Sequence, residues 1–166
     1  MTRDNTAAVY KHPSPEFSAF IKQMNSELGS VGLCHGCFDV FHFGHTIHLA
    51  EASSLCDYLI VSVTEDGFVL KGPRRPIFPS ERRALVLSAL RSVDCVVINN
   101  EPTATGIIDL VRPSKFFKGA DYIDSAHQGL LDEKMAVELN SGQVIFTEGD
   151  RHSSTNILAE IIKNGV

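Results

Sequence analysis

One stretch of the sequence decides the fold: Leu33-Cys-His-Gly-Cys-Phe-Asp-Val-Phe-His-Phe-Gly-His-Thr-Ile-His48. It joins an apolar segment, Val31–Cys34, which predicts a strand, to residues 44–55, whose apolar spacing predicts a helix. His42 and His45 therefore lie where a helix begins behind a strand, and backbone N–H groups and the helix dipole favour an anion there. Gly44 lets a phosphate approach the backbone, and the two imidazoles add hydrogen-bond donors. The stretch predicts a phosphate-binding site.

The alternation of short apolar strands with helices continues along the chain. Strands are predicted at 31–34, 58–63, 93–98, 115–117 and 143–146, and helices at 13–28, 44–55, 80–92, 104–111, 128–139 and 153–163. This succession predicts an α/β protein, a single Rossmann-like doubly wound domain with a five-stranded parallel sheet. Residues 1–28 are expected to form an N-terminal extension with a short helix, and residues 29–166 the main domain. In such sheets ligands bind outside the carboxyl ends of the strands.

The bulk composition limits the possible partners. A chain of 166 residues with 43% apolar residues is enough for one domain with a core. The net charge is −5, and no basic cluster occurs beyond Lys71–Arg75, so nucleic acid is not an expected partner. No apolar run reaches the ~18 residues of a membrane span, and the first residues lack the apolar core of a secretory signal. We expect a cytoplasmic protein that does not enter a membrane.

Cysteines and a third histidine leave alternatives open. Cys34 and Cys37 form a Cys-x-x-Cys, which is compatible with a thioredoxin-like redox pair, with half a zinc site, or with two thiols that are simply buried or half-buried. The sequence holds no second Cys-x-x-Cys to complete a zinc site. His48 continues the three-residue spacing of His42 and His45, so a shared metal is an alternative to helix capping and phosphate binding.

Several motifs in order resemble one family. Gly36-Cys-Phe-Asp39 with His42-Phe-Gly-His45 resembles the cytidylyltransferase-like (HxGH) nucleotidyltransferases. The resemblance extends from about Val31 to Ile162 and includes Lys71-Gly-Pro-Arg-Arg-Pro76, Pro79-Ser-Glu-Arg-Arg83, Lys118-Gly-Ala-Asp-Tyr122 and Arg151-His-Ser-Ser-Thr155. Within the family the sequence is most similar to the adenylyltransferase domain of ADP-heptose synthases, and next to glycerol-3-phosphate cytidylyltransferases. His35 stands where the heptose enzymes usually have asparagine.

The resemblance implies a reaction and a set of site residues. A nucleoside monophosphate would pass from a nucleoside triphosphate, with ATP favoured, to a sugar phosphate such as a heptose 1-phosphate, releasing pyrophosphate. The implied catalytic residues are His42, His45 and Lys71; the implied nucleotide-binding residues are Cys37, Phe38, Asp39, Gly44, Lys118, Gly119, Asp121, Arg151, Ser153, Ser154 and Thr155. Lys71 and Arg83 would bind the substrate phosphate. Mg²⁺ would be bound mainly through the triphosphate, without a metal site in the protein, and a homodimer or larger homo-oligomer is expected.

Three other functions remain open on the sequence. A CTP-dependent cytidylyltransferase could act on glycerol 3-phosphate or on another polyol or sugar phosphate, because residue types do not reveal which base is selected. The flavin mononucleotide adenylyltransferases share the HxGH site, although no long apolar flavin-binding segment is identifiable. A non-catalytic nucleotide-binding module is the third alternative, against which stand the two histidines, Lys71 and the Ser-Ser-Thr run at 153–155.

Overall fold

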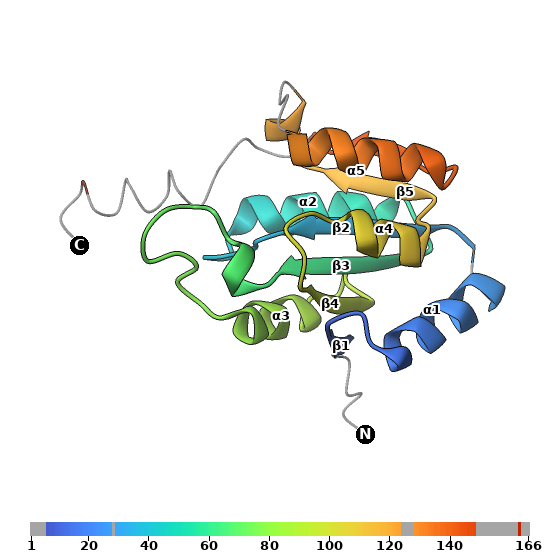
Figure 1. The fold of residues 1–166 in the computed structure, drawn as a ribbon, viewed down its shortest axis with the longest axis horizontal. Helices are drawn as coiled ribbons and strands as arrows, with labels where there is room; N and C mark the ends of the chain where they lie inside the picture. Colours follow the sequence, from blue (N-terminus) through green and yellow to red (C-terminus); the bar gives the residue numbers. More distant parts are fainter. Residues whose placement is uncertain (1–5, 28, 124–127, 149–162, 164–166) are drawn as a thin grey trace.

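The computed structural model describes residues 6–27, 29–123, 128–148 and 163. The chain forms strands and helices in regular alternation (Figure 1). In chain order they are β1 (Ala8–Lys11), α1 (Pro15–Glu27), β2 (Val31–Gly36), α2 (Phe43–Ser54), β3 (Tyr58–Thr64), the short 3₁₀ helix η1 (Asp66–Phe68), α3 (Ser80–Ser88), β4 (Cys95–Asn99), α4 (Thr105–Val111), β5 (Lys115–Lys118), the 3₁₀ helix η2 (Ala120–Tyr122), α5 (Gln128–Leu139) and β6 (Gln143–Phe146).

All strands belong to one parallel sheet in the order β1-β4-β3-β2-β5-β6. The predicted α/β class is confirmed, but the sheet has six strands where the sequence predicted five. The additional strand is β1, which pairs with β4 along Ala8↔Cys95 to Lys11↔Ile98 at the edge of the sheet. Its four residues lie within the predicted N-terminal extension, and three of them are exposed, so no apolar alternation indicated a strand.

Both faces of the sheet are covered, which explains why the central strands are almost continuously apolar. Along β4, Cys95 and Val97 pack on one face while Val96 and Ile98 pack on the other. The first face is covered by α1, α4 and α5, and the second by α2 and α3 (Figure 1). The sequence predicted a helix to Ser92, but α3 ends at Ser88. After it the N–H of Leu90 donates to the carbonyl of Leu87 in a turn that leads to β4.

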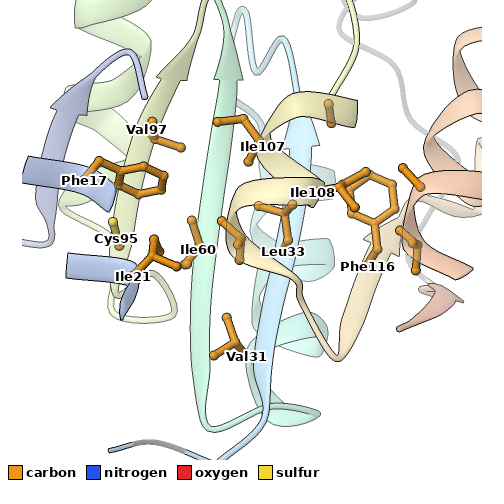
Figure 2. Packing of buried hydrophobic residues seen from close by; sticks show 14 residues of the cluster. Phe17, Ile21, Val31, Leu33, Ile60, Cys95, Val97, Ile107, Ile108 and Phe116 are labelled. Carbon is orange, nitrogen blue, oxygen red and sulfur yellow. The ribbon is translucent and has the colours of Figure 1, made fainter. Parts of the chain in front are cut away.

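Helix α1 packs on the chain's own sheet. Phe17 and Ile21 point toward the strands; Phe17 lies over Val97 and Cys95 of β4, and Ile21 lies beside Ile60 of β3 (Figure 2). Phe17 is 0% exposed and Ile21 is 3% exposed. Burial of apolar side chains of this size stabilises the fold by about 1.5–3 kcal/mol each. The apolar stripe of residues 17–28 therefore contributes to this core as far as the structure describes it.

The order in which strands are added to the sheet reverses between β2 and β5, which are parallel neighbours. From β2 the chain proceeds to β3 and β4 on one side, then crosses to β5 and β6 on the other. In open parallel sheets this reversal leaves a crevice at the carboxyl ends of the two strands, where ligands bind. No helix among the described residues has the length and apolar character needed to cross a membrane. The helix predicted at 153–163 falls almost entirely outside the described residues.

Candidate active site

The turn between β2 and α2 is held by its two histidines. His42 is the N-cap of α2, and its Nδ1 accepts the N–H of Gly44 at 3.2 Å. In return, Nδ1 of His45 accepts the N–H of His42 at 3.3 Å, which completes a reciprocal capping box. Since each Nδ1 accepts a hydrogen bond, each neutral ring carries its hydrogen on Nε2. The cap thus prepares two Nε2–H donors on rings whose centroids lie 3.9 Å apart.

The surroundings of His45 keep its ring in place and uncharged. The ring lies beside Phe38 and Phe41, with centroid distances of 5.4 and 5.3 Å. Burial lowers the pKa of His45 to about 3, and Coulombic interactions with His42, Lys71 and His48 lower it further. His45 is therefore a neutral donor at pH 7. The Coulombic influence of Lys71 also places the basic loop close to the histidine pair.

Asp39 holds the end of the basic loop that contains Lys71. Its carboxylate is 0% exposed and accepts the N–H groups of Ile77 at 3.0 and 3.1 Å and of Phe78 at 3.1 Å. Nε of Arg75 lies 2.8 Å from Oδ2 as an ion pair, without the alignment of a hydrogen bond. The resemblance implied a nucleotide contact for Asp39, whereas its hydrogen bonds and ion pair among the described residues are to this loop.

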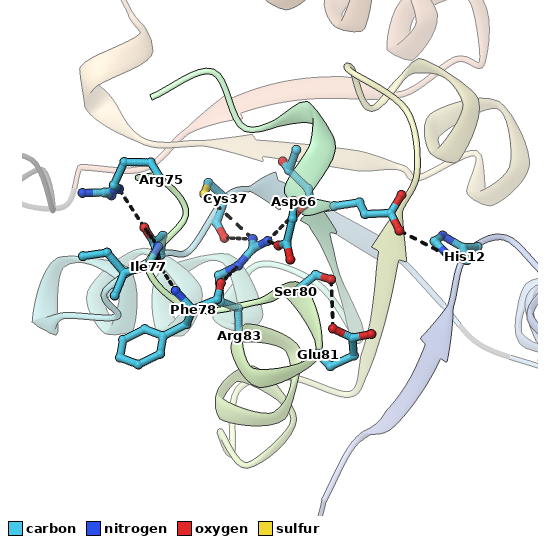
Figure 3. A network of polar contacts seen from close by, with 12 residues as sticks. His12, Cys37, Asp66, Arg75, Ile77, Phe78, Ser80, Glu81 and Arg83 are labelled. Carbon is cyan, nitrogen blue, oxygen red and sulfur yellow. Dashed lines mark hydrogen bonds and ion pairs between the residues drawn. The ribbon is translucent and has the colours of Figure 1, made fainter. Parts of the chain in front are cut away.

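Arg83 connects the turn after β2 with the end of β3 and the basic loop through hydrogen bonds and an ion pair (Figure 3). It is 2% exposed. Its Nε donates to the carbonyl of Phe78 at 2.8 Å, Nη2 donates to the carbonyl of Thr64 at 2.8 Å and pairs with Asp66, and Nη1 donates to the carbonyl of Cys37. These contacts direct the guanidinium to the protein. They do not give the substrate-facing position that the resemblance implied, because the donors are already engaged.

A cavity of about 270 Å³ occupies the predicted crevice at the carboxyl ends of β2 and β5. Its walls come from the strand ends, the segment after η1, the loop after β4, and α5. They are formed by His35, Gly36, Cys37, Thr64, Phe68, Val69, Leu70, Lys71, Pro102, Thr103, Lys118, Tyr122, Gly129, Leu130 and Glu133. Lys71 is exposed, lines this cavity and acts on the pKa of His45, so it connects the cavity with the histidine pair.

His35 forms a neutral part of the cavity wall. Its Nδ1 lies 3.0 Å from the hydroxyl of Ser62, and its Nε2 lies 3.4 Å from the hydroxyl of Thr64. Burial lowers the pKa of His35 to about 3, and the positive charge of Lys118 adds to this. The ring therefore adds no charge to the cavity wall at pH 7, and its two nitrogens contact the hydroxyls of Ser62 and Thr64.

An ion pair between β5 and α5 lies in the same wall. Nζ of Lys118 is 2.5 Å from Oε2 of Glu133, and each side chain is 6% exposed. Oε1 of Glu133 accepts the N–H of Ala104 at 3.0 Å. The Lys118 ammonium also lies 4.9 Å from the ring centroid of Phe116 and 5.2 Å from that of Tyr122. Lys118, for which the resemblance implied a nucleotide contact, thus lines the cavity and is paired with a carboxylate.

Other predicted groups have structural contacts. His48 Nδ1 lies 2.8 Å from the hydroxyl of Thr147, which joins α2 to the end of β6. Among the described residues there is no group of three His, Cys, Asp or Glu side chains that could hold a metal. Cys34 and Cys37 are free thiols. Burial raises the pKa of Cys34, which makes its thiol unreactive.

The structure brings together only part of the predicted site. His42, His45, Lys71, Cys37 and Lys118 surround the carboxyl end of β2 or line the cavity there. Gly44 gives its N–H to His42, Gly119 precedes η2, and Asp121 falls within η2. The predicted residues Arg151, Ser153, Ser154 and Thr155 lie outside the described residues.

Glu133 is a wall residue that the sequence reasoning missed. It occupies the buried face of α5 together with Leu130, Ala136 and Val137. An ionisable residue at the apolar spacing of a helix is unusual unless the charge is paired. The position of Glu133 among the regularly spaced apolar residues of this helix was the signal in the sequence that could have identified it.

Comparison with known proteins relates this chain to one family. Residues 33–160 match the family model described as cytidylyltransferase-like. The chain is 52% identical over 95 residues to the bifunctional protein HldE of Granulibacter bethesdensis, covering 56% of this chain and 20% of that protein. It is 38% identical over 150 residues to the bifunctional protein HldE of Nitrosococcus oceani, covering 89% of this chain and 31% of that protein. The chain therefore spans about a fifth to a third of the length of these relatives.

Solved structures share the fold. A lipopolysaccharide core biosynthesis protein from Thermoplasma volcanium superposes with a TM-score of 0.62 at 23% identity, covering 73% of this chain and 98% of that one. Pantoate-beta-alanine ligase from Francisella tularensis superposes with a TM-score of 0.64 at 15% identity, covering 95% of this chain and 77% of that one. At these identities the likeness confirms the doubly wound fold alone.

Proposed function

Because the chain belongs to the cytidylyltransferase-like family, with HldE proteins among its relatives, we propose that it is a nucleotidyltransferase that joins a nucleoside monophosphate to a sugar phosphate. The observation that carries the proposal is the reciprocal cap of His42 and His45, which fixes two Nε2–H donors beside Lys71 at the start of a helix. Such a group of fixed donors suits an oxyanion.

The reaction needs charge stabilisation more than covalent chemistry. A phosphate oxygen of the acceptor attacks the α-phosphorus of the triphosphate, a P–O bond forms, and the bond to pyrophosphate breaks. Negative charge increases on the α-phosphate oxygens and on the leaving group, and donors fixed there before reaction lower the barrier. The Nε2–H groups of His42 and His45 would hold these oxygens, and no protein nucleophile is required.

Lys71 would connect the two substrates. Its ammonium lines the cavity and lies near His45, so it can neutralise the acceptor phosphate while that phosphate approaches the α-phosphorus. Asp39 and Arg83 would act as positioning residues in this scheme. Asp39 holds the loop end at Ile77 and Phe78, and Arg83 ties that end to the turn at Cys37.

The remaining nucleotide contacts rest on the resemblance. The nucleotide site would be lined by Cys37, Phe38, Gly119 and Asp121. The outer phosphates would be bound by Arg151 and by Ser153–Thr155. Mg²⁺ would be held mainly by triphosphate oxygens and would neutralise part of their charge. The cytoplasmic location and the homo-oligomeric state stay predictions.

The preferred substrates are ATP and a sugar phosphate such as a heptose 1-phosphate, on the similarity to HldE proteins. The cavity of about 270 Å³ lies just below the ~300–1,000 Å³ usual for ligand pockets, which suits a small polar acceptor better than a flavin. CTP with glycerol 3-phosphate is the second candidate, because the cavity also accommodates that smaller polyol phosphate.

A pyrophosphate-release assay with ATP and CTP against a panel of phosphates tests the proposal. The panel would contain a heptose 1-phosphate, hexose 1-phosphates, glycerol 3-phosphate and flavin mononucleotide. We expect release with ATP and a sugar phosphate, and the predominance of CTP with glycerol 3-phosphate would instead select the second candidate. Nucleotide binding without release from any pair would point to a non-catalytic module.

A further inference from the structure

We propose that the Lys118–Glu133 ion pair recognises the acceptor, by binding a hydroxyl group of a polyhydroxylated phosphate inside the cavity. The inference rests on the proposed function and deepens it, because it assigns the acceptor a chemical class and a contact. The two side chains come from different elements, β5 and α5, and meet in the cavity wall at the switch point of the sheet.

Stability alone gives little reason for this pair. Both side chains are only 6% exposed, so both charges have lost most of their hydration. For buried pairs the desolvation penalty offsets much of the Coulombic attraction, and apolar replacements of similar volume are often as stable or more stable. Glu133 also occupies the apolar face of α5, beside Leu130 and Val137, where an apolar residue would pack directly. The charges therefore suit a ligand better than they suit the core.

The pair has hydrogen-bonding capacity left over. A carboxylate offers about four lone-pair positions and an ammonium offers three N–H donors. Glu133 uses Oε1 for the N–H of Ala104 and Oε2 for Lys118. Within the described part of the chain, Glu133 is the one ion-pair partner of the Lys118 ammonium. One acceptor position on each carboxylate oxygen and two ammonium hydrogens remain for a group in the cavity.

A hydroxyl group matches this arrangement. It donates its hydrogen to the Glu133 carboxylate and accepts an N–H from Lys118, so one group satisfies both charges. A phosphate fits poorly here, because the Glu133 carboxylate would repel it. The phosphate is expected at Lys71, which lines the same cavity and is the cation near the histidine pair. The acceptor would thus lie with its phosphate toward His45 and its hydroxyls toward α5.

Neutral hydrogen-bonding groups line the cavity between these ends. His35 is uncharged at pH 7 and lies between the hydroxyls of Ser62 and Thr64. Thr103 contributes a further hydroxyl-bearing residue. A wall with these polar groups suits the several hydroxyls of a sugar or polyol better than an apolar acceptor, which could make no hydrogen bonds with it.

Glu133→Gln is the variant that tests the inference. The amide keeps the size of the side chain and can still accept the N–H of Ala104, but it removes the charge that Lys118 and the hydroxyl share. Glu138→Gln is the matched control, because Glu138 is an exposed residue of the same helix. Steady-state kinetics would use ATP with a heptose 1-phosphate and its monodeoxy analogues, and titration calorimetry would measure binding of the same sugar phosphates without nucleotide.

We expect the unsubstituted protein to prefer the intact sugar phosphate over one of the deoxy analogues by at least ~100-fold in kcat/KM, since a site that binds a hydroxyl rejects the analogue lacking it. In Glu133→Gln that ratio should fall to within about tenfold, with a raised KM for the sugar phosphate, weaker calorimetric binding and an unchanged KM for ATP. Glu138→Gln should behave like the unsubstituted protein.

The experiment distinguishes a failure of this inference from a failure of the proposed function. If transfer occurs but Glu133→Gln keeps the full discrimination and the same calorimetric affinity, the inference is overturned and the proposed function stands. If no sugar or polyol phosphate is bound or used, both fail. Circular dichroism checks the fold, and should Glu133→Gln not fold, the double variant Lys118→Gln/Glu133→Gln removes both charges and carries the same expectation.

Discussion

Replacement of Asp39 by asparagine tests whether the basic loop is held as the structure indicates. The Asp39 carboxylate is 0% exposed, accepts the N–H groups of Ile77 and Phe78, and pairs with Arg75, whose side chain is 10% exposed. Asparagine keeps one oxygen acceptor. Its NH₂ group replaces the other oxygen and faces donors, and the charge opposite Arg75 is lost.

The magnitude follows from these contacts. Removing one partner of a buried ion pair destabilises by about 3–5 kcal/mol, because the other charge is left uncompensated. A domain of this size has a free energy of unfolding of about 5–15 kcal/mol, so the variant should remain folded at 25 °C. With a shift of about 2–4 °C for each kcal/mol, the Tm should fall by about 10 °C. Turnover should fall as well, since the loop that contains Lys71 loses its anchor.

Urea unfolding followed by circular dichroism measures the effect, with Asp132→Asn on the exposed face of α5 as a control expected within about 0.5 kcal/mol of the unsubstituted protein. A double-mutant cycle with Arg75→Met isolates the Asp39–Arg75 contact, and a coupling of about 1–3 kcal/mol is expected. A loss below about 1 kcal/mol for Asp39→Asn, or no coupling to Arg75, would refute the assignment of Asp39 to the loop.

Three further outcomes are expected. The pKa values of His35 and His45 are about 3 in the folded protein and about 6.5 when unfolded, so the unfolded chain binds protons that the folded one does not. Stability from this source is complete above pH 6.5 and should fall below it by up to about 1.4 kcal/mol per pH unit for each histidine. Urea unfolding at pH 7 and pH 5 would show no such loss if both rings were charged in the fold, and His35→Asn should reduce the slope. Replacing Cys34 and Cys37 by serine should keep the rate of pyrophosphate release within about tenfold, at some loss of Tm from a buried hydroxyl; inactivation by oxidant that the double variant escapes would show a regulatory disulfide instead. Light scattering at high micromolar concentration should give a dimer or larger assembly, and a monomeric mass there would exclude the expected homo-oligomer.

The fold was predictable where apolar periodicity was strong. The run Tyr58–Val63 and the pattern that follows Val31–Cys34 fixed the α/β class, because strands buried on both faces need continuous apolar sequence. Strand β1 was not predictable in this way. Its residues Ala8–Lys11 are mostly exposed at the sheet edge and become a strand only by pairing with β4.

The site was predictable where a local motif determines the contacts. His42 and His45 cap their own helix, so sequence spacing suffices to place them. The contacts of Arg83 and Asp39 depend on segments that approach only in the folded chain, at Thr64 and at Ile77. A charged residue near a motif therefore indicates a site without saying whether the charge faces a substrate or the protein. Glu133 illustrates the converse, since tertiary pairing gives a helix residue its place in the cavity.

The most direct test of the proposed reaction measures the transfer of the α-phosphate itself. ATP labelled at the α-phosphorus would be incubated with a heptose 1-phosphate, and label and pyrophosphate would be measured for the unsubstituted protein and for His42→Ala and His45→Ala. We expect one labelled nucleotide-sugar for each pyrophosphate, with kcat lowered by about two to four orders of magnitude in each variant, since a donor to the transition state is worth ~3–5 kcal/mol. Near-normal turnover in both variants, or no transfer of label to any phosphate acceptor with either ATP or CTP, would contradict the proposed reaction.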